Sequence, residues 1–109
     1  MDYMLVRHKV KDYNKWKMVY DQQLSARIAA GLKEVFQFRN ADSTNETIVL
    51  FEAADLNLAR KFTQSADLRK VMEEAGVIDQ PTIYFMNSVQ PWETQTQHKK
   101  SEQYTGTRR

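Results

Sequence analysis

The stretch YMLVRHKVKDYNKW, residues 3–16, contains the change from strand to helix that decides the fold. In its first half the residues alternate, so positions 4, 6, 8 and 10 would share one side of an extended chain and positions 5, 7 and 9 the other. This pattern predicts a strand over residues 3–11. Asp12 can then cap a helix, because its carboxylate can accept from the free amides of the first turn. Apolar residues recur every three or four positions beyond it, and they predict an amphipathic helix that Gly31 ends: Tyr13, Trp16, Tyr20, Leu24 and Ile28.

Outward from this stretch, the chain repeats the alternation of strands and helices. Residues 33–40 and 46–53 read as two strands, and the polar segment ADSTN between them predicts a hairpin. The second of these strands is apolar on both sides, which is typical of a central strand. Asp55 can cap a second helix, which we expect to break near Ser65 and to end at Gly76. Pro81 begins a last strand over residues 82–89, and proline at that position favours the edge of a sheet.

The predicted order is β-α-β-β-α-β, the ferredoxin-like arrangement of the α+β class. Right-handed crossovers give a four-stranded antiparallel sheet in the order 4-1-3-2, with both helices on one face. The other face still carries several large apolar side chains, which a monomer would leave exposed. We therefore predict a homodimer in which two sheets pack face to face as a dimeric α/β barrel.

Composition excludes several classes of protein. The chain of 109 residues is long enough for one domain, has no cysteine, and contains no apolar run long enough to span a membrane. Four of its 16 basic residues and two of its 14 acidic residues lie in 90–109, so residues 1–89 carry equal numbers of each sign. We therefore expect no nucleic-acid or membrane partner and, since the N-terminus shows no signal peptide, a cytoplasmic protein. Residues 1–89 form the predicted domain, and the polar tail 90–109 is predicted to be flexible or to reach a partner subunit through Trp92 and Tyr104.

Four segments carry a resemblance to a known family: LVRHKVKDYNKWKMVYD, FRNAD, LFEAADLNLARKFTQSADLRKVMEEAGV and PTIYFMNSV. Together they resemble the dimeric α/β-barrel superfamily over residues 3–89, in the branch near antibiotic-biosynthesis monooxygenases and stress-responsive barrel proteins. The resemblance implies the fold, whereas members range from cofactor-independent monooxygenases, polyketide cyclases and isomerases to haem-degrading and chlorite-decomposing enzymes. The sequence has no close match to the Asn and Trp catalytic pairing of the monooxygenases, which weakens that interpretation.

His8 is the candidate catalytic residue, because a histidine can act as acid or base near neutral pH. It lies in the middle of the predicted sheet, either beneath the helices or inside the barrel. The alternative is a packed histidine that bonds a neighbour. The other histidine, His98, lies in the tail, and the scarcity of histidine and cysteine predicts no metal site and no cofactor.

Six further residues are candidates for substrate binding. Arg39 could clamp a carboxylate or phenolate through its planar guanidinium, although it could equally pair with Glu46 or Glu52 across the hairpin. Tyr84 could donate a hydrogen bond to a ligand oxygen. Four aromatic residues could line a pocket for a flat ligand, or simply form core: Trp16, Tyr20, Phe36 and Phe51.

The sequence thus supports two hypotheses. In the first, the protein is a small-molecule-binding dimeric barrel, either a cofactor-independent monooxygenase or a cyclase-like enzyme, acting on a hydrophobic aromatic or polyketide-like metabolite. In the second, it is a non-catalytic, stress-related or structural homo-oligomer. An unfilled pocket of several hundred Å³ that reaches His8 would favour the first.

Overall fold

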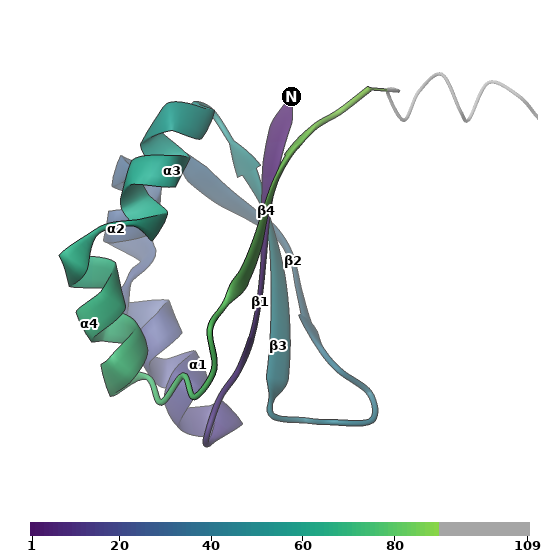
Figure 1. The fold of residues 1–109 in the computed structure, drawn as a ribbon, viewed down its shortest axis with the longest axis vertical. Coiled ribbons are helices and arrows are strands. Elements are labelled where there is room, and N and C mark those ends of the chain that lie inside the picture. The colour runs from purple at the N-terminus through teal and green to yellow at the C-terminus, as the bar shows by residue number, and fades with distance from the viewer. Residues whose placement is uncertain (90–109) are drawn as a thin grey trace, which may run out of the picture.

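The computed structural model describes residues 1–89, which form one sheet with all of their helices on one face (Figure 1). The elements, in chain order, are β1 (Asp2–Lys9), α1 (Tyr13–Gln22), α2 (Leu24–Ala29), β2 (Leu32–Arg39), β3 (Glu46–Ala53), α3 (Leu56–Thr63), α4 (Ala66–Glu74) and β4 (Thr82–Asn87). The predicted strands agree with the observed ones to within two residues at each end.

The four strands are ordered β2-β3-β1-β4, and each neighbouring pair is antiparallel. Read from the other edge, this is the predicted order 4-1-3-2, so the ferredoxin-like α+β fold is confirmed. Strand β3 lies inside the sheet and β4 at its edge, as the apolar pattern and Pro81 indicated. Dimer pairing stays a prediction.

The predicted ends of the helices are confirmed by their contacts. The Asp12 carboxylate accepts from the amides of Asn14 and Lys15, and Asp55 caps α3 in the same way. The Ser65 hydroxyl accepts from the Leu68 amide, so the second helical segment does break there. Gly31 has φ of +75°, a conformation that side chains with a Cβ rarely adopt, and its carbonyl accepts from the Ala54 amide.

The first helical segment differs from the prediction. It breaks at Gln23, where φ is −100° and ψ is 18°, and forms α1 and α2 instead of one helix. Leu24 and Ile28, which we placed on the buried stripe, are 55% and 64% exposed. Residues 1–89 therefore place four helices on one face of the sheet, because the first predicted helix is divided at Gln23 as well as the second at Ser65.

The two faces of the sheet differ in what covers them. Met4, Val6, Val49 and Phe51 face the helices, and each is less than 9% exposed. The opposite face has no helix over it within residues 1–89 (Figure 1). It carries three aromatic residues that are 48–58% exposed, together with partly exposed aliphatic residues of the central strands: Phe36, Phe38, Tyr84, Leu5, Ile48 and Leu50.

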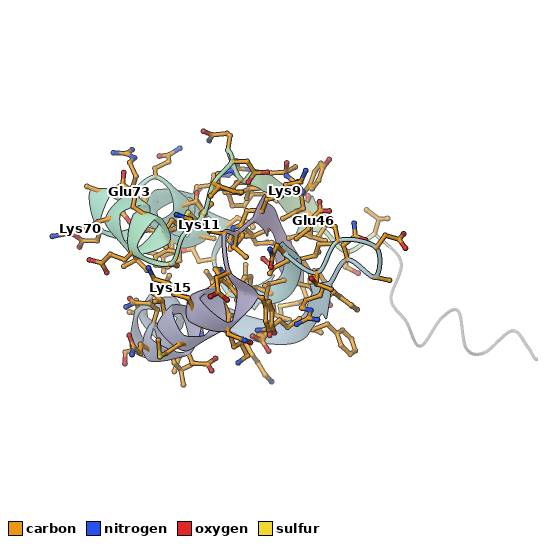
Figure 2. The ribbon with its side chains drawn as sticks, turned by 90° about the horizontal axis from the view of Figure 1, so that it is seen from below. Lys9, Lys11, Lys15, Glu46, Lys70 and Glu73 are labelled. Carbon is orange, nitrogen blue, oxygen red and sulfur yellow. The ribbon has the colours of Figure 1, made fainter. Side chains whose placement is uncertain are left out.

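Charged side chains of both signs gather at one end of the molecule. Figure 2 labels Lys9, Lys11, Lys15 and Lys70 there, and Glu46 and Glu73 lie among them. Arg7 forms ion pairs with Glu46 and Asp79 on the side of β1 that faces away from His8. No helix of the described residues is long and apolar enough to cross a membrane. The tail 90–109, with the predicted docking of Trp92 and Tyr104, lies outside the described residues.

Candidate functional site

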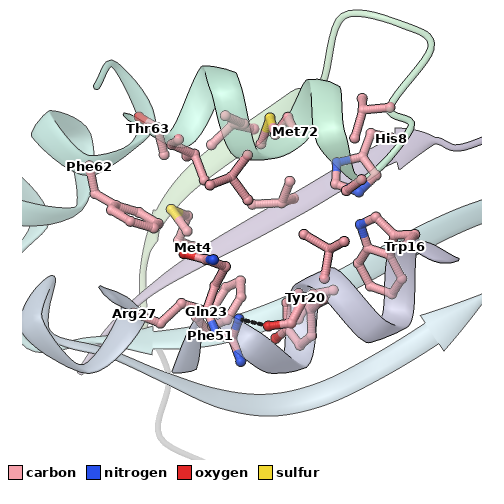
Figure 3. Close-up of a pocket in the computed structure, with 18 residues that line it drawn as sticks. Met4, His8, Trp16, Tyr20, Gln23, Arg27, Phe51, Phe62, Thr63 and Met72 are labelled. Atoms are coloured by element: carbon pink, nitrogen blue, oxygen red, sulfur yellow. Dashed lines mark hydrogen bonds between the residues drawn. The ribbon is translucent and has the colours of Figure 1, made fainter. Parts of the chain in front are cut away.

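A cavity lies between the sheet and the two pairs of helices that cover one face of it, α1–α2 and α3–α4 (Figure 3). Its walls are mainly apolar, with Met4 and Phe51 from the sheet, Phe62 from α3 and Met72 from α4. The cavity has a volume of about 80 Å³ and is open to solvent on one side. It reaches His8, but its volume falls short of the several hundred Å³ expected for a drug-sized ligand.

His8 is the most unusual residue of this cavity. Its side chain points from β1 toward the helices and is 6% exposed, so of the two predicted positions it occupies the one beneath the helices. Neither ring nitrogen has a hydrogen-bond partner within residues 1–89. Burial lowers the pKa of His8 to about 4, and the smaller influences of Asp79 and Arg7 oppose each other. At neutral pH the imidazole is therefore uncharged, with one nitrogen free to donate and the other free to accept.

A second unpaired polar group lies beside His8. Thr47 is directly opposite His8 in the β1–β3 pair, and so points to the same face of the sheet. It is 1% exposed, and its hydroxyl oxygen has no hydrogen-bond partner among residues 1–89. A buried polar group without a partner costs about 1–3 kcal/mol, and most such groups in proteins are paired. Only His8 of the two lines the cavity, so its ring nitrogens are the groups to which a molecule bound there could supply the missing partners.

An aromatic row along α1 forms another wall of the site. The ring centroids of Tyr13 and Trp16 are 5.8 Å apart, and those of Trp16 and Tyr20 are 4.9 Å apart. The edge of Trp16 also packs against His8, at 5.7 Å between centroids and 73° between planes. Figure 3 shows His8 and Trp16 together at one end of the cavity.

Each end of the aromatic row is covered by an arginine. The Arg39 guanidinium lies 4.3 Å from the ring centroid of Tyr13, and that of Arg27 lies 3.7 Å from the ring centroid of Tyr20. The Tyr20 hydroxyl donates to Glu34 at 2.5 Å. Burial, and then this hydrogen bond, raise the pKa of Tyr20, so its phenol stays protonated across the physiological range. Tyr20 is thus a fixed wall of the cavity and not a proton donor to solvent.

The structure brings four of the predicted site residues together and separates the other three from them. The four that line the cavity are His8, Trp16, Tyr20 and Phe51. Phe36 and Tyr84 lie on the open face of the sheet, 58% and 57% exposed. Arg39 is exposed at the end of β2, where it stacks on Tyr13. For these three residues a role in ligand binding stays a prediction that the cavity does not support.

Neither glutamate that the sequence offered to Arg39 pairs with it, since Glu52 lies at the other end of the β2–β3 pair and Glu46 has other partners. Glu46 accepts hydrogen bonds from Arg7 and from Asn40. These two bonds lower the pKa of Glu46, so its carboxylate stays ionised and committed to them. Arg39 has instead a cation–π contact, of a kind that contributes about 0.5–1 kcal/mol at an exposed site.

Three polar residues of the cavity were not predicted from the sequence: Gln23, Arg27 and Thr63. For the first two, the signal was present in the spacing, because positions 16, 20, 23 and 27 follow one side of a helix as well as positions 16, 20, 24 and 28 do. Leu24 and Ile28 were preferred because they are apolar. Elsewhere in residues 1–89, no three His, Cys, Asp or Glu side chains lie close enough together to hold a metal ion.

The sheet and its helices form a ferredoxin-like fold. No protein-family model matches the chain, and a comparison with curated proteins found no match. Solved structures do match. A candidate antibiotic biosynthesis monooxygenase from Bordetella bronchiseptica aligns with a TM-score of 0.66 and 14% identity, covering 82% of this chain and 97% of its own.

Two further structures support the same fold. SnoaB from Streptomyces nogalater, a cofactor-independent oxygenase, aligns with a TM-score of 0.64 and 12% identity over 84% of this chain and 95% of its own. A candidate antibiotic biosynthesis monooxygenase from Caulobacter crescentus aligns with a TM-score of 0.61 and 14% identity, covering 82% of this chain and 90% of its own. These neighbours confirm the predicted resemblance as one of fold. At such identities they carry no residue roles to this chain.

Proposed function

We propose that the protein binds a small, largely apolar molecule in the cavity between its sheet and its helices, with His8 as the group that recognises it. The observation that carries this proposal is the pair of unpaired nitrogens on a histidine that lines a mainly apolar cavity. A histidine with a purely structural role would be expected to bond a neighbour, as most buried polar groups do. The volume of about 80 Å³ favours a single ring or a short chain over a multi-ring polyketide.

The chemistry we propose is proton transfer at His8, in the setting of cofactor-independent oxygenation or a cyclase-like reaction. A neutral imidazole can accept the proton of a ligand hydroxyl, which leaves a ligand oxyanion beside an imidazolium. Burial opposes a charged imidazole in the empty cavity, but an adjacent oxyanion raises the pKa of that imidazole and so favours the transfer. The fold neighbour SnoaB is a cofactor-independent oxygenase, which makes this reaction class the first to test.

We also propose that the protein is a homodimer that joins the open faces of two sheets. Phe36, Phe38 and Tyr84 are about half exposed on a face that no described helix covers. Exposed apolar surface of this kind usually marks an interaction site. The same face favours the second candidate function, a non-catalytic structural homo-oligomer, which differs from the first in having no ligand.

A binding screen decides between these two functions. The full chain is titrated with single-ring phenols, hydroquinones and quinones, and affinities are measured by calorimetry on the wild type and on His8→Phe. This variant keeps an aromatic edge against Trp16 but removes both nitrogens. Binding that weakens in the variant, at least tenfold, supports the ligand-binding function. Absence of binding across the panel, or equal binding by the variant, would favour the structural oligomer.

A further inference from the structure

Arg27 is a buried cation without an acidic partner in the part of the chain that the structure describes. Its side chain is 8% exposed, and it lines the same cavity as His8. The guanidinium donates one hydrogen bond, from Nη1 to the Tyr20 carbonyl at 2.6 Å. No ion pair joins Arg27 to any carboxylate within residues 1–89. The nearby Glu34 is exposed and accepts from Tyr20 and Gln37 instead.

This arrangement leaves a positive charge at the cavity only partly compensated. An arginine stays protonated at every physiological pH, and a buried charge is costly unless a partner offsets it. The Tyr20 ring, 3.7 Å from the guanidinium carbon, supplies a cation–π contact, and the Tyr20 carbonyl supplies one acceptor. A guanidinium has five N–H donors in a planar fork, so most of them remain available to a planar anion.

Arg27 and His8 lie at opposite ends of the cavity. Figure 3 shows Arg27 and Gln23 toward one end, with Met4, Phe51 and Phe62 near them, and His8 and Trp16 at the other end. The two ends offer different chemistry, since Arg27 favours an anion whereas the neutral, buried His8 favours an uncharged donor or acceptor. The rest of the lining is mainly apolar, with Tyr20 and Thr63 as its other polar residues. A molecule that satisfies all three parts carries an acid group at one end and a hydroxyl or carbonyl at the other.

We infer that the ligand of this cavity is a small organic acid with an apolar body, whose carboxylate pairs with Arg27 while its other end reaches His8. The inference rests on the proposed function, because it names the chemical class of molecule that the same cavity takes. Arg27 would then be a specificity-determining residue, and Gln23 a second donor beside it. The hydrogen bond from Arg27 to the Tyr20 carbonyl would keep the guanidinium in place between α1 and α2.

Acid and amide probes of equal shape test this inference. The affinities of the full chain for 4-hydroxybenzoate and 4-hydroxybenzamide are compared by calorimetry, because the two differ chiefly in charge. We expect the acid to bind on the order of tenfold to a hundredfold more tightly, the range of a hydrogen-bonded charge pair. Arg27→Met should abolish that preference and leave binding of the amide nearly unchanged.

Two control variants test whether a change in the acid preference is specific to the charge of Arg27. Arg39→Met removes an arginine that also stacks on a tyrosine of α1 but lies outside the cavity, and it should keep the preference for the acid. Arg27→Lys should retain part of the preference, and it serves if Arg27→Met fails to fold. Equal binding of acid and amide by the wild type would overturn the inference and leave the proposed function standing. If neither probe binds and no member of the phenol and quinone panel binds, both the inference and the proposed ligand-binding function are overturned.

Discussion

Replacing His8 by phenylalanine should change how the stability of the protein depends on pH. In the native state burial lowers the pKa of His8 to about 4, whereas in the unfolded chain it returns to about 6.5. Between these values the unfolded chain binds a proton that the native protein does not. Acid therefore favours unfolding over this range. Above about pH 6.5 both states are neutral at His8, and below about pH 4 both are protonated, so the effect is confined to the interval between them.

The size of the effect follows from the two pKa values. Each tenfold change in proton affinity is worth about 1.4 kcal/mol, so the full loss of stability through His8 is about 3 kcal/mol. From pH 7 to pH 5 the loss is about 2 kcal/mol, since at pH 5 the unfolded histidine is almost fully protonated. A loss of 2 kcal/mol is a large part of the stability of a small domain, which is about 5–15 kcal/mol.

Urea unfolding at pH 7 and pH 5, followed by circular dichroism, measures this effect. The wild type should lose about 2 kcal/mol more than His8→Phe between the two pH values. Acidic groups whose lowered pKa does not depend on His8, such as Glu46, also destabilise the native state in acid, but they do so in both proteins and cancel in the difference. His98→Phe is the matched control, because it removes the other histidine of the chain, and it should behave as the wild type does. Equal losses in the wild type and in His8→Phe would refute a buried, neutral His8.

Three further predictions concern a turn, a buried hydroxyl and the open face of the sheet. Gly31→Ala should lower the free energy of unfolding by about 1 kcal/mol in a thermal melt, because alanine is strained at a φ of +75°; an unchanged melting temperature would count against that turn. Thr47→Val should leave the protein as stable or raise its stability by about 1 kcal/mol, since it removes a buried hydroxyl without a partner, whereas Thr47→Ser should lower it. Phe38→Asp should convert the proposed dimer to monomers in sedimentation experiments, because it places a charge on the open sheet face. Leu58→Asp, at an exposed position of α3, should leave the dimer intact. A dimer that survives Phe38→Asp would rule out the open sheet face as the interface.

The fold could be predicted from the sequence because each element carries its own local signal. Asp12, Asp55 and Ser65 cap their helices with side-chain oxygens, and Gly31 and Gly76 adopt the positive φ values expected at helix ends. Alternation in the strands then sets which residues face the helices. These signals depend on neighbours in the chain, so one sequence is enough to read them.

The site was only partly predictable because it depends on how the helices sit on the sheet. His8 and Trp16 come together across β1 and α1, whereas alternation alone left open whether His8 faces the helices or the inside of a barrel. No glycine or proline lies at Gln23, so the sequence does not predict the helix break there. Because of this break, Arg27 is buried and Ile28 is exposed. Phe36 and Tyr84 were placed in a pocket on aromatic character alone, but alternation puts them on the open face of the sheet.

The most direct test of the central claim is the imidazole nitrogen NMR spectrum of the full chain, recorded from pH 5 to pH 9 with and without single-ring aromatic ligands. The account predicts that the His8 nitrogens do not titrate over this range in the free protein, because the pKa lies near 4. It also predicts that they shift when a ligand of the cavity binds. A His8 resonance that titrates near pH 6.5, or that no ligand shifts, would contradict the claim that a neutral His8 recognises a molecule bound in the cavity.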